Sequence, residues 1–288
     1  MTFSIVAYDP EQEAWGVAVA SKFLAVGAVV SWARAGAGAV ATQSFCKMSF
    51  GPDGLALMEQ GKSARETLDS LLTADPQAAT RQVGVVDRYG GTAAHSGSEC
   101  FDWKGHVMGE GFTCQGNILA GAQVVHDMAD AFKAAKGELA DRLVLALAAG
   151  DAAGGDKRGR QGAAVLVVKA NAGYGGDNDR YLDLRVDDDP LPIPRLQKLV
   201  SAHHLFFGKP DPADQTPITP EIARQIQTWL RTQGYTTADV TGQWDEASKH
   251  AFWAMVGSEN LEERWSLSGN TNNIDKVALA YLQDRFGT

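Results

Sequence analysis

The chain has 288 residues, 44% of them hydrophobic and 21% charged, which is the composition of a globular protein with enough length for one large core and a smaller second one. Its formal net charge of −9 argues against the broad positive surface that nucleic-acid binding requires, so no nucleic-acid partner is expected. The three cysteines, Cys46, Cys100 and Cys114, lack metal-ligand spacing, and we expect structural thiols rather than disulfides or a zinc site.

The N-terminal segment carries Asp9, Glu11 and Glu13 and has no basic stretch before an apolar one, so it does not have the pattern of a signal peptide. The sequence has no uninterrupted run of about 18 apolar residues, so it predicts no membrane-spanning helix. We therefore expect a cytoplasmic protein that does not enter a membrane. HExxH, CxxC and EF-hand spacings are also absent from the sequence, so neither a metal ion nor a cofactor is expected.

Apolar runs rich in valine, alanine and other small residues predict strands that are packed on both faces near the start of the chain. Two helices are expected next, the second of them preceded by Ser63 and Glu66, whose spacing is that of a capping box. The expected strands span residues 2–8, 15–21, 25–33 and 36–43, and the expected helices span residues 52–60 and 63–74.

The chain then returns to strands, and the turn residues Tyr89-Gly90-Gly91 predict a hairpin. Apolar residues at helical spacing between positions 120 and 149 predict two amphipathic helices that are separated at Gly137. The expected strands of this part span residues 82–87, 92–95, 105–114, 163–169 and 181–186. This alternation predicts an α+β fold, with sheets inside and helix pairs outside.

A helix is expected near residues 195–206, and the proline-rich stretch Gly208-Lys209-Pro210-Asp211-Pro212 that follows it predicts a linker. We therefore predict two domains, residues 1–208 and 215–288. The second has a helix start at Thr219-Pro220-Glu221 and a helix stop at Gly234, so a small all-α domain is expected. Its expected core consists of Trp229, Leu230, Trp244, Phe252, Trp253, Leu279 and Leu282.

Thr2 directly follows the initiator Met1 and opens an apolar strand. If Met1 is removed, the Thr2 hydroxyl lies beside a free α-amine, whose ordinary pKa of about 7.7–8.0 leaves a useful fraction neutral at pH 7. Such an amine can accept the hydroxyl proton, so Thr2 can act as nucleophile and base in one residue. The alternative is that Thr2 is only the first residue of a strand, with a hydroxyl that has no chemical role.

Two short polar segments follow predicted strands and are candidates for the same site. Lys22 comes after Ala20-Ser21, and its positive charge can lower the pKa values of the Thr2 amine and hydroxyl, although it can equally be a solvated surface lysine. Gln43, in Thr42-Gln43-Ser44, can line a pocket or start a turn.

The segment Gln115-Gly116-Asn117 is a third candidate. Gly116 permits close approach of the backbone, and the side-chain amides of Gln115 and Asn117 can donate hydrogen bonds to a developing oxyanion. Asn117 can alternatively cap a helix.

The loop at residues 152–162 combines glycines with charged residues, so it can hold Asp156 and Arg158 near a ligand. Arginine suits bidentate recognition of a carboxylate, and the alternative is a flexible surface loop. His95 can act as a general base, or it can be a structural histidine.

Six segments of the first 200 residues carry a resemblance: TFSIVA at 2–7, GVAVAS at 16–21, AVATQ at 39–43, RQVGVVD at 81–87, QGN at 115–117 and AGGDKRG at 153–159. In this order they resemble an uncharacterised bacterial family that is placed with the N-terminal-nucleophile (Ntn) hydrolases. The resemblance implies a four-layer αββα sandwich with its active site at the end of the two central sheets, and hydrolysis of an amide bond. The tail, with Thr241-Gly242-Gln243-Trp244-Asp245 and Ile274-Asp275, resembles a peptidoglycan-binding-like module.

The sequence thus leads to the hypothesis of an Ntn-type amidohydrolase that acts on a small amide or carboxylate-bearing ligand. Thr2, Lys22 and Asn117 are its expected catalytic residues, and Gln43, His95, Gln115, Asp156 and Arg158 its expected substrate-binding residues. The alternative hypothesis is a non-catalytic ligand-binding or scaffold protein that keeps the fold. In either case a homo-oligomer is expected, and the C-terminal domain is expected to bind a glycan or a protein partner.

Overall fold

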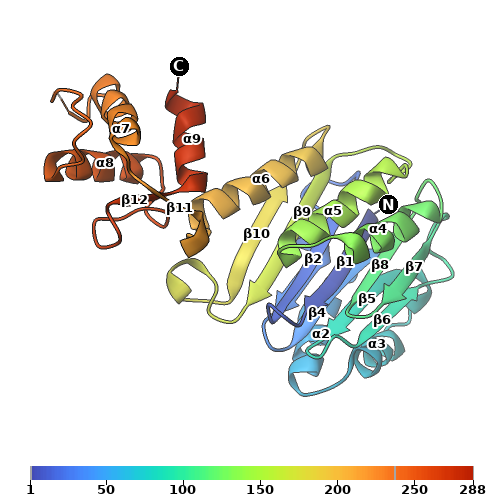
Figure 1. Cartoon of the computed structure of the whole chain (residues 1–288). Coiled ribbons are helices and arrows are strands. Elements are labelled where there is room, and N and C mark those ends of the chain that lie inside the picture. Colours follow the sequence, from blue (N-terminus) through green and yellow to red (C-terminus); the bar gives the residue numbers. More distant parts are fainter. Residues whose placement is uncertain (1, 237, 288) are drawn as a thin grey trace. The chain divides into compact units, whose positions relative to one another are not determined.

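The computed structural model describes residues 2–236 and 238–287, and the chain divides between Val200 and Ser201 into two compact units (Figure 1). Helix α6 (Pro192–Phe207) continues across this division. Ile193, Leu196 and Val200 pack into the core of the first unit. The predicted domain bounds, 1–208 and 215–288, remain predictions.

Two antiparallel sheets form the centre of the first unit. The larger has the strand order β10 (Arg180–Val186), β9 (Gly162–Lys169), β2 (Ala14–Ser21), β1 (Thr2–Asp9), β8 (Phe112–Asn117), β7 (Gly105–Gly109). The smaller has the order β3 (Ser31–Arg34), β4 (Gly38–Ser44), β5 (Arg81–Asp87), β6 (Thr92–Ser96). The chain is therefore a mixed α+β protein, as its sequence pattern predicts, and the structure shows that its sheets are antiparallel.

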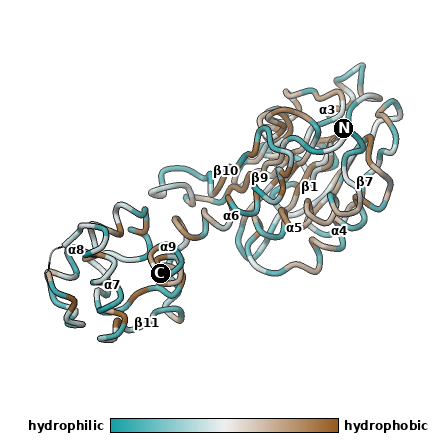
Figure 2. The backbone as a smooth tube through the Cα atoms, turned by 90° about the horizontal axis from the view of Figure 1, so that it is seen from above, coloured by the Kyte–Doolittle hydropathy of each residue, from teal (hydrophilic) through white to brown (hydrophobic). Residues whose placement is uncertain are grey.

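Three apolar clusters hold the layers of this unit together. Because side chains alternate along a strand, β1 directs Phe3 and Ile5 outward onto α4 (Gln123–Ala134) and α5 (Leu139–Ala152), and directs Val6 inward between the two sheets. On the outer face of the smaller sheet, Val83 and Val85 pack against α2 (Phe50–Glu59) and α3 (Ala64–Thr73). Helix pairs therefore cover the outer faces of both sheets (Figure 1). Figure 2 shows the apolar strands β1 and β9 within this unit.

The predicted strand at 25–33 is wrong, because the short helix α1 (Gly27–Val30) precedes β3. Ala25 has a φ of 51°, which an extended chain does not permit, and the following turn directs Val26 and Val30 into the core between the sheets. The predicted strand at 105–114 is two strands, β7 and β8. Gly111 has a φ of 71° in the turn between them, a left-handed conformation that glycine adopts without strain.

Besides the end of α6, the second unit holds three α-helices in its described part, and its core is the predicted one. Trp229, Leu230, Phe252, Leu279 and Leu282 are buried in one cluster, and Trp244 and Trp253 pack against it. Its elements are β11 (Gln215–Pro217), α7 (Pro220–Thr232), α8 (Glu246–Ser258), β12 (Asn273–Asp275) and α9 (Lys276–Phe286).

The expectation of an all-α second domain is wrong in one respect, because β11 and β12 form a two-stranded sheet. Gln215 pairs with Asp275, far along the chain, and strands of three residues are too short to show a period in the sequence. In the described part of the chain, no helix has both the length and the apolar character that crossing a bilayer needs.

A chain that ends at Pro210 is expected to unfold cooperatively on heating. It keeps the residues of α6 that pack in the first core, while the removed unit has a core of its own. Circular dichroism at increasing temperature measures this, with the full chain as the control. A non-cooperative transition in the shortened chain would show that the two units depend on a shared core.

Candidate functional site

Thr2 lies at one end of the two-sheet core, where several strands begin or end. In the larger sheet Thr2 is opposite Asn117, the last residue of β8, and Phe3 is opposite Ala20 near the end of β2. In the smaller sheet Gln43 is opposite Gln82, so β4 ends where β5 begins. The two sheets meet at this end, because Gln43 Nε2 lies 3.4 Å from the Thr2 carbonyl oxygen, which accepts its hydrogen bond.

The Thr2 side chain is buried, with 7% of the residue exposed, and its Oγ1 lies 3.1 Å from Ser21 Oγ. Ser21 is the last residue of β2, so two hydroxyl groups from neighbouring strand ends are in contact. The role that the sequence assigns to the amine of Thr2 depends on Met1, which lies outside the described residues.

Gln82 is the centre of a buried hydrogen-bond network next to Thr2. Its Oε1 accepts hydrogen bonds from Gln43 Nε2 and Asn117 Nδ2, both at 2.9 Å. Its Nε2 donates to the Gly116 carbonyl at 2.7 Å and to Ser96 Oγ at 2.8 Å. Three of these side chains, those of Gln43, Gln82 and Asn117, are at most 1% exposed. Gln82 thus links strands of both sheets at the end where Thr2 lies.

Gln115 forms a second part of the same buried network. Its Nε2 donates to the hydroxyl and the carbonyl of Ser4, at 2.7 and 3.2 Å, and its Oε1 accepts from Thr113 Oγ1 at 3.0 Å. Ser4 in turn donates to Gln43 Oε1 at 2.8 Å. A side chain at Gly84 would collide with Gln115, so this glycine leaves the space that the amide occupies between the sheets.

Asp156 fastens the glycine-rich loop to the end of β2. The buried carboxylate accepts hydrogen bonds from the backbone N–H groups of Lys22 and Arg158, both at 2.8 Å, and from the Arg158 side chain at 3.2 Å. The Lys22 ammonium instead donates to the Arg160 carbonyl at 3.3 Å, and this side chain is exposed. Solvent screening weakens the electrostatic effect of this exposed charge on Thr2.

Residues 2–196 match the model of the family described as "Family of unknown function (DUF1028)". The chain belongs to this family. It is 33% identical to protein SPO2555 from Silicibacter pomeroyi, a DUF1028 protein of known crystal structure, with a TM-score of 0.65 over 70% of this chain and 86% of that one. Residues 206–282 match the family described as "Putative peptidoglycan binding domain". No curated protein matches the chain.

Of the predicted site residues of this DUF1028 chain, Thr2, Gln43, Gln115 and Asn117 come together, and Asp156 joins them through Lys22. His95 does not join them. It is opposite Val83, whose side chain packs under α2 and α3, and His95 Nε2 lies 2.9 Å from the Ala78 carbonyl oxygen. Because side chains alternate, His95 faces away from the inner face on which Gln82 lies.

Ser4, Ser21 and Gln82 belong to this group as well, although the sequence did not predict them as site residues. A signal for Ser4 was present, because polar residues stand at alternate positions in β1, at Thr2 and Ser4, and in β8, at Thr113, Gln115 and Asn117. Gln82 follows Arg81 directly at the start of β5, where no such alternation marks it. Polar residues spaced by two in otherwise buried strands indicate one shared polar face. No such pattern in β2 indicates the contact of Ser21 with Thr2.

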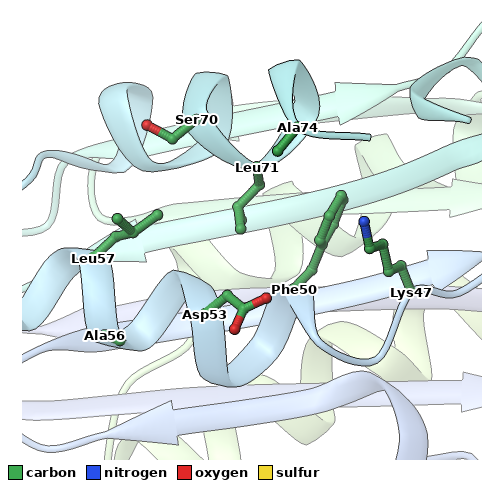
Figure 3. Close-up of a pocket in the computed structure, with 8 residues that line it drawn as sticks. All are labelled: Lys47, Phe50, Asp53, Ala56, Leu57, Ser70, Leu71 and Ala74. Atoms are coloured by element: carbon green, nitrogen blue, oxygen red, sulfur yellow. The ribbon is translucent and has the colours of Figure 1, made fainter. Parts of the chain in front are cut away.

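Two pockets of this DUF1028 chain lie away from Thr2. One, of about 500 Å³, is lined by Tyr8 and Arg142 at the other end of β1. The other, of about 390 Å³, lies between α2 and α3, with Leu57 and Leu71 in its wall and Lys47 near the ring of Phe50 (Figure 3). Neither is lined by a predicted site residue.

The three cysteines of this DUF1028 chain are free thiols, as expected. Cys114 is completely buried in the core, and burial raises the pKa of its thiol far above the ordinary value. Burial also raises the pKa of the Cys46 thiol, against the smaller lowering effect of a hydrogen bond with Thr42. Neither thiol therefore has the low pKa that marks a reactive cysteine.

An ion pair supports the loops beside this site. Arg81 Nε donates to the buried Asp75 carboxylate at 2.7 Å, and other atoms of the guanidinium donate to the Phe45 carbonyl and to Gln77. The hydrogen bond from Arg81 holds the pKa of Asp75 below its ordinary value.

Asp75→Asn is expected to destabilise the protein at pH 7 but not in acid. Because the folded-state pKa of Asp75 is lowered, the unfolded chain binds more protons as the pH falls, so the stability that Asp75 contributes is present above pH of about 4 and lost below it. Urea unfolding at several pH values measures the difference between wild type and variant. Glu99→Gln, an exposed carboxylate in a nearby loop, is the control. A difference that stays constant between pH 7 and pH 3 would contradict this account.

Proposed function

We propose that this chain is an Ntn-type amidohydrolase that cleaves a small amide, with Thr2 as its nucleophile. The observation that supports the proposal most is the position of Thr2. It is the residue after the initiator, its hydroxyl is in contact with Ser21, and it begins a central strand at the end where two sheets share a polar network. The layered packing of helices on both sheets is compatible with the αββα sandwich of the Ntn hydrolases.

In the proposed reaction, the Thr2 hydroxyl oxygen attacks the amide carbonyl carbon while the neutral α-amine accepts the hydroxyl proton. The tetrahedral intermediate then loses its amine, which takes up the proton, and an ester between the substrate acyl group and Thr2 remains. Water attacks this ester in the second half of the reaction and releases the carboxylic acid and the free Thr2 hydroxyl. Ser21 Oγ, 3.1 Å from Thr2 Oγ1, orients the nucleophile.

Asn117 is the better of the two proposed oxyanion donors. Its Nδ2 donates one hydrogen bond to Gln82 and carries a second N–H, whereas both N–H bonds of Gln115 are directed at Ser4. Asn117 is also the strand partner of Thr2, so its side chain is held on the same face of the sheet. Gln115 and Gln43 are therefore proposed to position the site from within the network.

The remaining residues have supporting roles in this proposal. Asp156 holds the backbone at Lys22 and thereby the end of β2, while Arg158, whose side chain is 44% exposed, is the proposed contact for a substrate carboxylate. Lys22 supplies a weak positive potential. His95 lies on the other face of its sheet and is given no role in the proposed reaction.

The C-terminal unit is proposed to bind a glycan, on the basis of its peptidoglycan-binding family match. A cytoplasmic location and a homo-oligomer are further proposals that the fold leaves open. The alternative function, a ligand-binding or scaffold protein without catalysis, would apply if Thr2 kept a blocked amine.

Measurement of the intact mass of the protein purified from its native cells tests the proposal. The expected mass is lower than that of the full translated chain by one methionine residue, because catalysis requires a free amine on Thr2. Reaction of the protein with an amine-labelling reagent at neutral pH, followed by peptide mapping, is expected to place a label on Thr2. A retained Met1 would overturn the proposal and favour the binding protein.

A further inference from the structure

Large apolar side chains are exposed around the end of the sheets where Thr2 lies. They come from three loops, and each is about half exposed to solvent. They are Phe23, Leu24, Phe45, Met48 and Phe101, which we call the apolar rim. Exposed apolar side chains are ordinary when scattered, but a group of them beside polar residues marks a binding surface.

Each part of the apolar rim is tied to a residue of the Thr2 site. Phe23 follows Lys22, whose backbone N–H is held by Asp156. The Phe101 carbonyl accepts a hydrogen bond at 3.0 Å from the N–H of Ile118, the residue after Asn117. Phe45 comes two residues after Gln43 in the sequence. The rim therefore surrounds the same strand ends that position Thr2.

Phe45 and Phe101 form a fixed pair within this rim. Their ring centroids are 5.9 Å apart and the rings are tilted by 50°. The backbone of Phe45 is held on both sides, because its N–H donates to the Thr80 carbonyl at 3.4 Å and its carbonyl accepts from Arg81. Two loops thus hold these rings in place while leaving them about half exposed, which is the arrangement of a preformed apolar contact surface.

We propose that the substrate amide carries an aromatic or bulky aliphatic group, which binds against Phe45 and Phe101; this inference rests on the proposed function of Thr2. The buried network beside Thr2 offers a hydrogen bond to an amide, and the rim next to it presents the half-exposed rings of Phe45 and Phe101. A substrate with an apolar group next to its amide matches both regions at once. A purely polar amide would leave the rim exposed and gain nothing from it.

Binding to the Thr2→Ala protein tests this proposal without requiring turnover. The probes are acetamide, phenylacetamide and N-benzylacetamide, so that the ring is tested on the acyl side and on the amine side of the amide. Titrations followed by NMR chemical shifts are expected to give at least about tenfold tighter binding for one of the two aromatic probes than for acetamide. Equal binding of all three probes would overturn the proposal.

Variants of the rim complete the test. Phe45→Ser and Phe101→Ser are expected to remove the preference for the aromatic probe, whereas Phe45→Leu, which keeps an apolar side chain, retains most of it. Tyr174→Ser, which removes an exposed ring at the other end of β9, is the matched control. A preference that survives both serine variants would overturn the proposal. A preference that is lost in them, in a protein that never hydrolyses an amide, would support this inference and contradict only the catalytic role of Thr2.

Discussion

Thr2→Ala is expected to lower the kcat for amide hydrolysis by about 10⁴-fold or more, the usual effect of removing a nucleophile from a catalytic unit. Alanine is also small, so removal of Met1 is expected to continue, and the side chain loses the hydroxyl together with the γ-methyl group. The contact with Ser21 Oγ is lost as well, but the strand pairing of residue 2 with Asn117 involves the backbone and remains. Single-turnover kinetics on an aromatic amide, together with a melting curve of the variant, measure this effect.

Thr2→Ser is the matched control for this prediction. It keeps both the hydroxyl and the α-amine, so a measurable fraction of the wild-type rate is expected. Mass spectrometry of the serine variant during turnover is expected to detect the acyl group on residue 2. If the alanine variant turned over at the wild-type rate, Thr2 would not be the nucleophile.

Gln82→Leu is expected to destabilise the first unit by about 3–5 kcal/mol, because it leaves buried hydrogen-bonding groups without partners. The side-chain amides of Gln43 and Asn117 would lose their acceptor, and the Gly116 carbonyl would lose its donor. For a domain of this size, the melting temperature is expected to fall by about 10 °C. Urea unfolding and differential scanning calorimetry measure the two quantities.

Ser96→Ala provides the comparison for Gln82→Leu. Ser96 accepts one hydrogen bond from Gln82 and is only half-buried, so its replacement is expected to cost about 1 kcal/mol. If Gln82→Leu cost no more than Ser96→Ala, the network would contribute little to folding. The amidase activity of folded Gln82→Leu protein, compared with that of the wild type, measures how far Gln82 positions Asn117 for the reaction.

The sequence determined most of the secondary structure and the core of the second unit. Strands such as β1 and β9 and helices such as α4 and α5 follow from local patterns of apolar residues, whose periods depend only on chain geometry. The predicted capping box is confirmed for the same reason, since Ser63 and Glu66 bond each other across a single turn. The place of Thr2 directly after Met1 is covalent and needs no fold to establish it.

Only the tertiary structure decided which polar residues meet. Gln82 and Asn117 are 35 residues apart in the chain, and no local pattern specifies that their amides form a hydrogen bond at 2.9 Å. That bond depends on how the two sheets stack, which brings the polar ends of β4, β5 and β8 around the start of β1. His95 is the opposite case. The sequence predicts it as a site residue, but strand pairing directs its side chain to the outer face of the smaller sheet, away from Gln82. The local period of apolar residues decides which side chains of one strand share a face. Long-range strand pairing and sheet packing then decide which of these side chains meet in a site.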